Sequence, residues 1–328
     1  MVKNLRKKKV VVVGGGTGIY QVLTGLKHFP LDLSAVVTMS DSGGSTGKLR
    51  RELSILPPGD IRRALIALSD LPLAQKTLEK LFDFRFENGK TLKGHSLGNL
   101  LLAALIQITG REDLAIKEAG RILSVSGYVY PVTLDKVHLV AILQNGKRLF
   151  GETNIDLRWH GKKFSKTPIK SVYLSPKAKV FEDTDKVLRE ADVIILGPGD
   201  LYTSVVPNLL VDGVSDAIAV SRAKLVLIVN LMTKPGETDK FKASDFLRIT
   251  RSYLGKAGEK VSHILVNNEF PDSVKTLAWY KKFASEPVLD DLDGAANNVK
   301  IIRSSFTQEG ELMRHDSAKL ANAIMSLL

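Results

Sequence analysis

The chain has 328 residues, and its hydrophobic content of 44% is enough for a substantial buried core. It has no cysteine, which excludes a disulfide framework, a thiolate zinc site and a cysteine nucleophile. The formal net charge is +12, but aromatic residues make up only 6% and no zinc-finger or helix-turn-helix signature accompanies the basic residues. We therefore do not expect nucleic acid to be the partner.

The first strong pattern is a strand, a glycine turn and a helix. The apolar run Val10 to Val13 leads into Gly14, Gly15, Gly16, Thr17 and Gly18, and an amphipathic pattern continues to about Lys27. Backbone N–H groups of such a turn can reach an anion, and the helix start adds its positive dipole end. The pattern therefore predicts a phosphate-binding turn, although a tight turn with no ligand is the alternative.

The glycine spacing excludes two standard nucleotide motifs. A dinucleotide fingerprint would need a third glycine where Ile19 or Gln21 stands. A Walker A loop fails at residues 42–49, which lack its first glycine and its final hydroxyl. The upstream run Val10 to Val13 is too short for a secretory signal or a membrane span. We expect a cytoplasmic protein with no membrane span.

The next elements also alternate between strand and helix. Residues 34–39 predict a buried strand that ends at Asp41, and Asp60 is predicted to cap a helix over residues 61–69. Another helix is expected to begin after Ser96, with Ser96 as its N-cap. Its predicted core face is an apolar stripe: Leu97, Leu100, Leu101, Ala104, Leu105 and Ile108.

Between residues 130 and 180 the pattern changes to alternation, with Asn145-Gly146 as a hairpin signal. A helix near Asp183, strands over residues 193–196, 225–231 and 263–267, and a last helix capped by Asp316 complete the chain. The predicted fold class is α/β and Rossmann-like, a mostly parallel sheet flanked by helices, with a β-rich antiparallel insertion at 130–180. Residues 1–8 are predicted to be a basic tail and 9–328 a single domain.

Three loops follow predicted parallel strands: residues 14–18, 41–47 and 197–201. Ligands bind beyond the carboxyl ends of such strands, so we expect these loops to converge on one cleft. Asp41 could bind a ribose, hold Mg²⁺ or merely cap the turn at Gly43-Gly44.

Other candidates are less specific. His95, in the run Gly94 to Asn99, could bind phosphate or move a proton, or be a structural turn histidine. Tyr280 could stack on a base and Arg314 could bind a pyrophosphate, although both could equally be exposed surface. No G-x-S-x-G elbow or histidine pair at metal-ligand spacing is present.

Together the motifs resemble the bacterial gluconeogenesis factor family, within the superfamily of 2-phospho-L-lactate transferase (CofD). The resemblance is nearly end to end and rests on seven runs of sequence: residues 11–18, 41–47, 55–62, 94–99, 196–204, 232–238 and 314–316. One difference is that the family pattern has two acids before Gly43-Gly44, whereas here Asp41 is followed by Ser42. A two-carboxylate Mg²⁺ site in that loop is therefore in doubt.

The resemblance implies a protein that binds a nucleotide-diphosphate ligand, usually a UDP-sugar such as UDP-N-acetylglucosamine. Such a protein regulates cell-envelope precursor supply and cell shape, and we expect a sensor rather than an enzyme. An NADP-like nucleotide, a regulatory protein partner and a homo-oligomer stay open. The expected ligand-binding residues lie in the loops named above and near the C-terminus: Gly14, Gly15, Gly16, Thr17, Gly18, Asp41, Gly43, Gly44, Ser45, His95, Asn99, Gly197, Pro198, Gly199, Tyr202, Tyr280 and Arg314.

The transferase branch of the superfamily supplies the alternative. Its members move a phospholactyl group from a nucleotide-activated donor to a deazaflavin acceptor with Mg²⁺. In that case Asp41 would hold Mg²⁺, and His95 or Asp60 would manage the proton of the acceptor. These three residues are the catalytic candidates, and no resident cofactor is expected beyond the nucleotide ligand.

Overall fold

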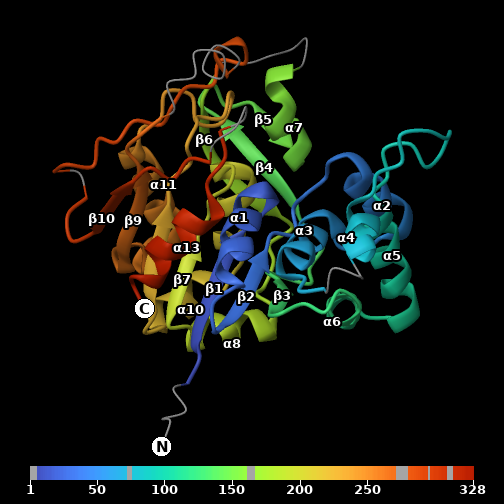
Figure 1. Ribbon diagram of the computed structural model, residues 1–328. Helices are drawn as coiled ribbons and strands as arrows, with labels where there is room; N and C mark the ends of the chain where they lie inside the picture. Colours follow the sequence, from blue (N-terminus) through green and yellow to red (C-terminus); the bar gives the residue numbers. More distant parts are fainter. Residues whose placement is uncertain (1–5, 72–75, 161–166, 271–279, 295, 309–312) are drawn as a thin grey trace, which may run out of the picture.

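The fold, seen in a computed structural model, is a parallel sheet with helices on both faces (Figure 1). The structure describes residues 6–71, 76–160, 167–270, 280–294, 296–308 and 313–328. Residues 1–5 of the basic tail therefore lie outside the described residues, and the first strand already begins at Lys8. Of the helices in the described ranges, none combines the length and the hydropathy that crossing a bilayer requires.

Seven strands form the main sheet, in the order β10-β9-β8-β7-β1-β2-β3, and every neighbouring pair is parallel. The strands are β1 (Lys8–Gly14), β2 (Leu31–Val37), β3 (Tyr128–Pro131), β7 (Val193–Leu196), β8 (Lys224–Ile228), β9 (Val261–Asn267) and β10 (Lys300–Ser304). The chain builds outward from β1 to β3 on one side, then returns to β7 and builds outward to β10 on the other. The strand order therefore reverses between β1 and β7, the place where open α/β sheets bind ligands.

Helices cover both faces of the sheet, and α1, α3 and α13 pack together on one of them. The helices are α1 (Gly16–Leu26), α2 (Gly44–Leu53), α3 (Pro58–Leu68), α4 (Lys76–Asp83), α5 (Leu97–Thr109), α6 (Glu112–Ile122), α7 (Glu152–Asp156), α8 (Glu182–Glu190), α9 (Val206–Leu209), α10 (Val214–Val220), α11 (Ala243–Leu254) and α13 (Ser317–Met325). Short turns of other helix types span Leu157–His160, Leu201–Val205 and Gly255–Lys260.

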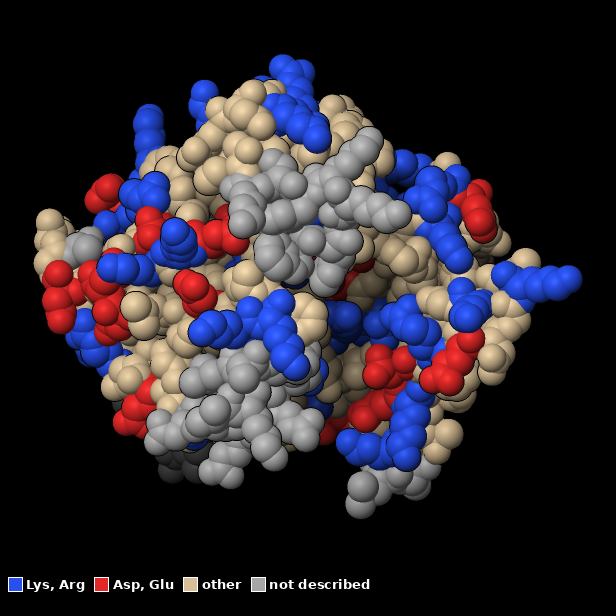
Figure 2. Space-filling view, turned by 90° about the horizontal axis from the view of Figure 1, so that it is seen from above, with Lys and Arg blue, Asp and Glu red and all other residues tan. Residues whose placement is uncertain are grey.

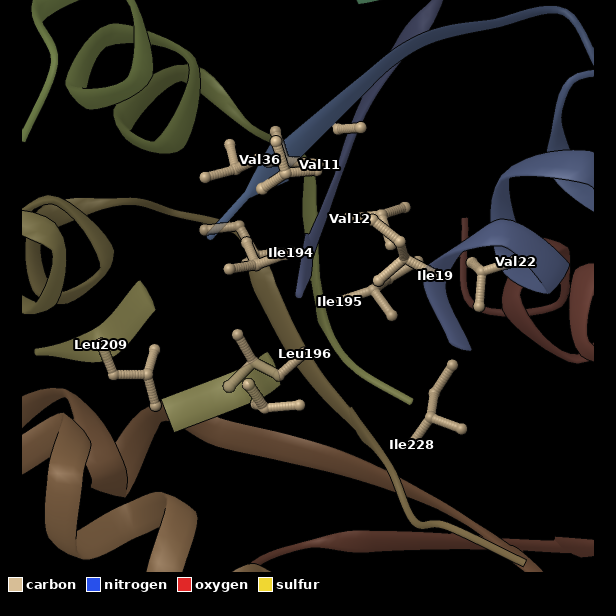
Figure 3. Packing of buried hydrophobic residues seen from close by; sticks show 14 of the residues in the cluster. Val11, Val12, Ile19, Val22, Val36, Ile194, Ile195, Leu196, Leu209 and Ile228 are labelled. Carbon is tan, nitrogen blue, oxygen red and sulfur yellow. The ribbon is translucent and has the colours of Figure 1, made fainter. Parts of the chain in front are cut away.

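The core is continuous across the sheet because both of its faces are apolar. Figure 3 shows Ile19 of α1 against Val12 and Ile195, while Val11 and Ile194 point to the opposite face. All five side chains are at most 1% exposed. Double-sided burial explains why these strands are unbroken apolar runs rather than alternating ones.

The predicted antiparallel insertion is present as a second sheet. Strands β4 (His138–Leu143), β5 (Arg148–Phe150) and β6 (Ile169–Ser175) pair in the order β5-β4-β6. The Asn145-Gly146 turn joins β4 to β5, and the Asn145 carbonyl oxygen Oδ1 accepts from the Lys147 amide at 3.1 Å. At the start of the predicted range, residues 130 and 131 belong to β3 and pair with β2 instead.

The structure corrects the prediction that Asp60 caps a helix. Helix α3 begins at Pro58, so Asp60 lies within its first turn, and the N-cap is Pro57. The Asp60 carboxylate instead accepts a hydrogen bond from the Gly16 amide at 2.9 Å. Proline at the first helical position starts the helix earlier than the apolar pattern indicates.

The predicted core face of α5 is only partly correct, because Leu100, Leu101 and Leu105 are half-buried against the core while the fully buried residues lie elsewhere on the helix. The helix buries Gly98, Asn99, Leu102 and Ala103, whereas Ile108 is 79% exposed. A Cβ on Gly98 would lie 2.4 Å from the Phe82 carbonyl oxygen, so this side of the helix is in backbone contact with its neighbour. Because nearly every position of the helix is apolar, periodicity alone could not select the buried face. Ser96 is the N-cap residue as predicted, but its hydroxyl makes no capping bond.

Candidate functional site

Two adjoining cavities open where the strands of the main sheet end. The larger has a volume of about 610 Å³ and the smaller about 320 Å³. Figure 2 looks onto this edge and shows a hollow near its centre, with basic and acidic side chains around it. Six residues line both cavities: Gly16, Arg63, Asp156, Asp200, Ser204 and Lys234. The cavities are therefore two compartments of one site.

The glycine turn forms one wall of the larger cavity. Gly16 has a φ of +65°, a conformation that favours glycine, and begins α1. A Cβ on Gly18 would lie only 2.1 Å from the Pro198 carbonyl oxygen, so the turns after β1 and β7 are in backbone contact. The amide groups in the first turn of α1 have no intrahelical partner, and only that of Gly16 is used by Asp60. This end of α1 is suited to an anion.

Aromatic and apolar side chains lie at another wall of the larger cavity. Tyr280 and Phe283 line it, and the Tyr280 hydroxyl accepts a hydrogen bond from the Met313 amide at 2.9 Å. Arg314 lines the same cavity and is exposed. His315 next to it is buried and bonds the Val229 carbonyl through Nε2 at 3.2 Å; burial lowers its pKa to about 4, so its ring is neutral. This wall offers a flat ring and a cation to a ligand.

Carboxyl groups dominate the smaller cavity. Burial, together with the nearby Asp41, raises the pKa of Asp60 to about 7 and that of Glu152 to about 8. The pKa of Asp41 itself is raised, again mainly by burial. Asp41 Oδ1 also accepts from the Gly43 amide at 2.8 Å, so it caps the turn while lining the cavity. These carboxyl groups hold protons at higher pH than usual.

A lysine sits among three more acids where the cavities meet. Asp156, Asp200 and Glu237 present oxygen atoms within 4.8 Å of one another, close enough to surround a cation. The Lys234 ammonium lies 2.6 Å from Asp156 Oδ1 and 3.2 Å from Asp200 Oδ2. Although burial opposes its charge, the neighbouring Asp200 holds the pKa of Lys234 above its ordinary value.

The arrangement of these acids does not fit Mg²⁺. Glu237 is 3% exposed, and its two oxygen atoms already accept from the Tyr202 amide at 3.2 Å and from the Thr203 hydroxyl at 3.0 Å. Burial raises its pKa to about 8, and Asp200 adds to the shift. With Lys234 as the counterion, this group holds an ammonium rather than a metal ion.

Most of the predicted ligand residues line one of the two cavities. Gly15, Gly16, Thr17, Gly18, Pro198, Gly199, Tyr280 and Arg314 line the larger one, and Gly16, Asp41, Gly43, Gly44, Ser45 and Asn99 the smaller. The three loops after β1, β2 and β7 therefore converge as expected.

Four predicted residues line neither cavity. Gly14 ends β1, and Gly197 bonds back to β1 through its amide. Tyr202 is 2% exposed and packs in the hydrophobic core. His95 is 6% exposed and lies behind Ser45, whose hydroxyl is 3.1 Å from His95 Nδ1.

The sequence patterns did not indicate several of the charged residues. Arg63 and Lys234 line both cavities, and Glu152 and Asp156 reach the site from α7. Lys234 lies in the run 232–238 that followed a predicted strand, which was a usable signal. Glu152 and Asp156 lie inside the antiparallel insertion, where no motif marks them.

The fold and the site together define a Rossmann-like α/β protein that presents a phosphate-suited turn and two joined cavities at the point where its strand order reverses. The family model described as 2-phospho-L-lactate transferase CofD matches residues 10–307. The chain therefore belongs to the CofD family, among its gluconeogenesis factors.

Relatives match over nearly the whole chain. The gluconeogenesis factor of Halalkalibacterium halodurans is 44% identical over 98% of this chain and 97% of its own length. That of Bacillus subtilis is 41% identical over 98% of this chain and 99% of its own. A crystal structure of a Bacillus halodurans protein, 43% identical, has a TM-score of 0.90 and covers 98% of this chain and 100% of that one.

Proposed function

We propose that this protein binds a nucleotide-diphosphate sugar, such as UDP-N-acetylglucosamine, across both cavities and acts as a cytoplasmic regulator of cell-envelope precursor supply and cell shape. The observation that carries the proposal is the backbone contact of the turns after β1 and β7, which brings the start of α1 to the larger cavity. A diphosphate bound there would be held by amide groups and by the helix dipole.

The remaining contacts fit the rest of such a ligand. Arg63 and Lys234 line both cavities, so they would reach a diphosphate that bridges them. Tyr280 would stack on the base, and Arg314 would lie on the nucleoside side. A ligand that contacts residues from both halves of the chain would favour one arrangement of this edge, and a protein partner could recognise that arrangement.

Isothermal titration tests the proposal directly. UDP-N-acetylglucosamine, UDP-glucose, UDP and NADP are titrated in turn into the full-length protein, with inorganic phosphate as the control. We expect one UDP-sugar to bind per chain, with a dissociation constant in the micromolar range or below, and phosphate to bind much more weakly. Absence of heat with all three uridine nucleotides would overturn the proposal.

A second candidate function is transfer of a phospholactyl-type group. It is favoured by Asp41 and Asp60, which line the same small cavity next to the expected diphosphate, since carboxylate oxygens are the ligands that Mg²⁺ accepts. Mg²⁺ would offset charge on the donor diphosphate there. His95 is poorly placed for the acceptor because it lines neither cavity. Release of nucleoside monophosphate from a nucleotide-activated donor, dependent on Mg²⁺ and lost in Asp60→Asn, would establish this function.

A further inference from the structure

The two cavities differ in the chemistry of their walls. The larger has apolar or aromatic side chains such as Leu231, Met232, Tyr280 and Phe283. In the described part of the chain, the smaller is lined by glycine and by polar or charged residues alone. A nucleobase is flat and largely apolar on its faces, whereas a sugar ring presents hydroxyl groups around its rim, so each cavity fits one end of a nucleotide sugar.

The smaller cavity is rich in hydrogen-bond acceptors. Asp41, Asp60 and Glu152 line it with carboxyl groups, each of which accepts one backbone amide and keeps capacity for a further donor. Asn99 and Thr203 add an amide and a hydroxyl. Its volume of about 320 Å³ lies near the lower end of the range for small-molecule sites, about 300 to 1,000 Å³. A group with several hydroxyl donors can use the remaining lone pairs of these carboxyl groups, whereas an apolar group would displace water from them without offering a donor.

The basic residues around this cavity are partly neutralised already. Arg62 pairs with Asp83 at 2.6 Å and Lys234 pairs with Asp156 and Asp200, while Arg63 and Arg85 line the cavity as well. Asp41 raises the pKa of Asp60 and Glu152 even though Arg63 is close to it. A further negative charge placed here would meet the same repulsion.

We infer that the smaller cavity is the sugar compartment and selects an uncharged, hydroxyl-rich sugar over one that carries a carboxylate. This inference rests on the proposed function, because it assumes that a nucleotide diphosphate occupies the larger cavity. It goes further in naming the class of sugar, and it names Asp41 and Glu152 as the residues that exclude an acidic sugar.

The test compares two ligands that differ only at carbon six of the sugar, UDP-glucose and UDP-glucuronate, with UDP as the reference for the larger cavity. We expect UDP-glucose to bind at least about tenfold more tightly than UDP-glucuronate at pH 9, where Asp60 and Glu152 are both ionised. The ratio should shrink as the pH falls toward 6, because the carboxyl groups of the cavity gain protons while the glucuronate keeps its charge.

At pH 9 Glu152→Gln removes one charge from the cavity and keeps the shape of the side chain, so it should reduce the ratio of UDP-glucose to UDP-glucuronate affinity at least about threefold. Asp41→Asn is a second variant that keeps an oxygen for the Gly43 amide. Glu118→Gln on α6 is the control, since its carboxylate forms an ion pair with Arg121 and lines neither cavity. An unchanged circular dichroism spectrum shows in each variant that the fold is intact.

Two results would be decisive in different ways. If UDP binds but UDP-glucuronate binds as tightly as UDP-glucose, the inference falls and the proposed function stands. If UDP and all UDP-sugars fail to bind, both the proposed function and the inference that rests on it are overturned. A ratio that neither variant changes would also overturn the role given to Asp41 and Glu152.

Discussion

The two cavities share six residues but are built from different parts of the fold. The larger lies over the ends of central strands, where the turns after β1, β7 and β8 supply glycine, proline and backbone groups. The smaller is assembled from helices outside the sheet, α2, α3, α5 and the short α7 of the insertion. On the proposed function, the sheet would provide a general place for phosphate, and the peripheral helices would provide the charged side chains that distinguish what is attached to it.

Gly18→Ala should break the larger cavity and have the greatest effect. The new Cβ would lie 2.1 Å from the Pro198 carbonyl oxygen, and neither backbone can move without separating the two turns. We expect a loss of about 3 kcal/mol in the free energy of unfolding, measured with urea, and loss of UDP binding. Gly146→Ala in the β4–β5 hairpin is the control: nothing lies within 4 Å of its Cβ, so it should cost only backbone strain. A Gly18→Ala protein with parental UDP affinity would show that the two turns do not form the phosphate site.

Lys234→Met should affect both cavities at once. It leaves Asp156 and Asp200 without their counterion. Because the lysine side chain is 32% exposed, we expect a loss of about 2 kcal/mol rather than the larger cost of a fully buried pair. Lys76→Met, in the exposed pair with Glu79 on α4, should cost less than about 0.5 kcal/mol. Equal losses in the two variants would mean that Lys234 is not a structural counterion.

The raised pKa values of three carboxyl groups predict that the stability of the fold declines as the pH rises. Asp60, Glu152 and Glu237 have pKa values of about 7, 8 and 8 in the folded protein, above their ordinary values of 3.8, 4.5 and 4.5. The folded state therefore binds more protons than the unfolded state between about pH 4.5 and 8, and stability is lost through this window. We expect the free energy of unfolding to decrease across this window, measured by urea unfolding at several pH values. Glu152→Gln should flatten the curve, and stability that increases with pH across the window would contradict the assignment.

Tyr280→Ala should have the smallest effect of these changes, and it tests whether the two cavities act separately. Removing the ring should weaken UDP and UDP-sugars about equally, by about tenfold, because the ring lines only the larger cavity. Tyr280→Phe keeps the ring and loses the bond to the Met313 amide, so most of the affinity should remain. A change in the ratio of UDP-glucose to UDP-glucuronate affinity in Tyr280→Ala would show that the two compartments are not chemically separate.

Predictions from sequence succeeded where the signal was local. The strand over residues 193–196 was located to the residue, and the last helix begins after Asp316, whose carboxylate accepts from the Lys319 amide at 2.8 Å. The strand is marked by a short apolar run and the helix by its capping residue, and both signals lie within a few positions of the element itself. The strand β10 was missed because it is short, has only two apolar residues, Ile301 and Ile302, and lies at the sheet edge, where its side chains are half-buried or exposed.

The residues of the candidate site also fall into two groups, those that local sequence indicates and those that it does not. The glycine turn after Val13 is apparent from its own residues, because an apolar strand followed directly by glycines and a helix allows few structures. Glu152 and Asp156 could not be found in this way, since they are ordinary acids in an inserted segment that reaches the site only when the second sheet packs beside the first.

The sequence by itself determined the fold class, the three phosphate-suited loops and the family, since all of these follow from local patterns and contiguous motifs. Only the tertiary structure decided which face of α5 is buried, that Asp60 bonds Gly16 instead of capping its helix, and that Lys234 is surrounded by acids. The physical reason is that burial and charge pairing depend on distances between residues far apart in the chain, and local pattern carries no information about them.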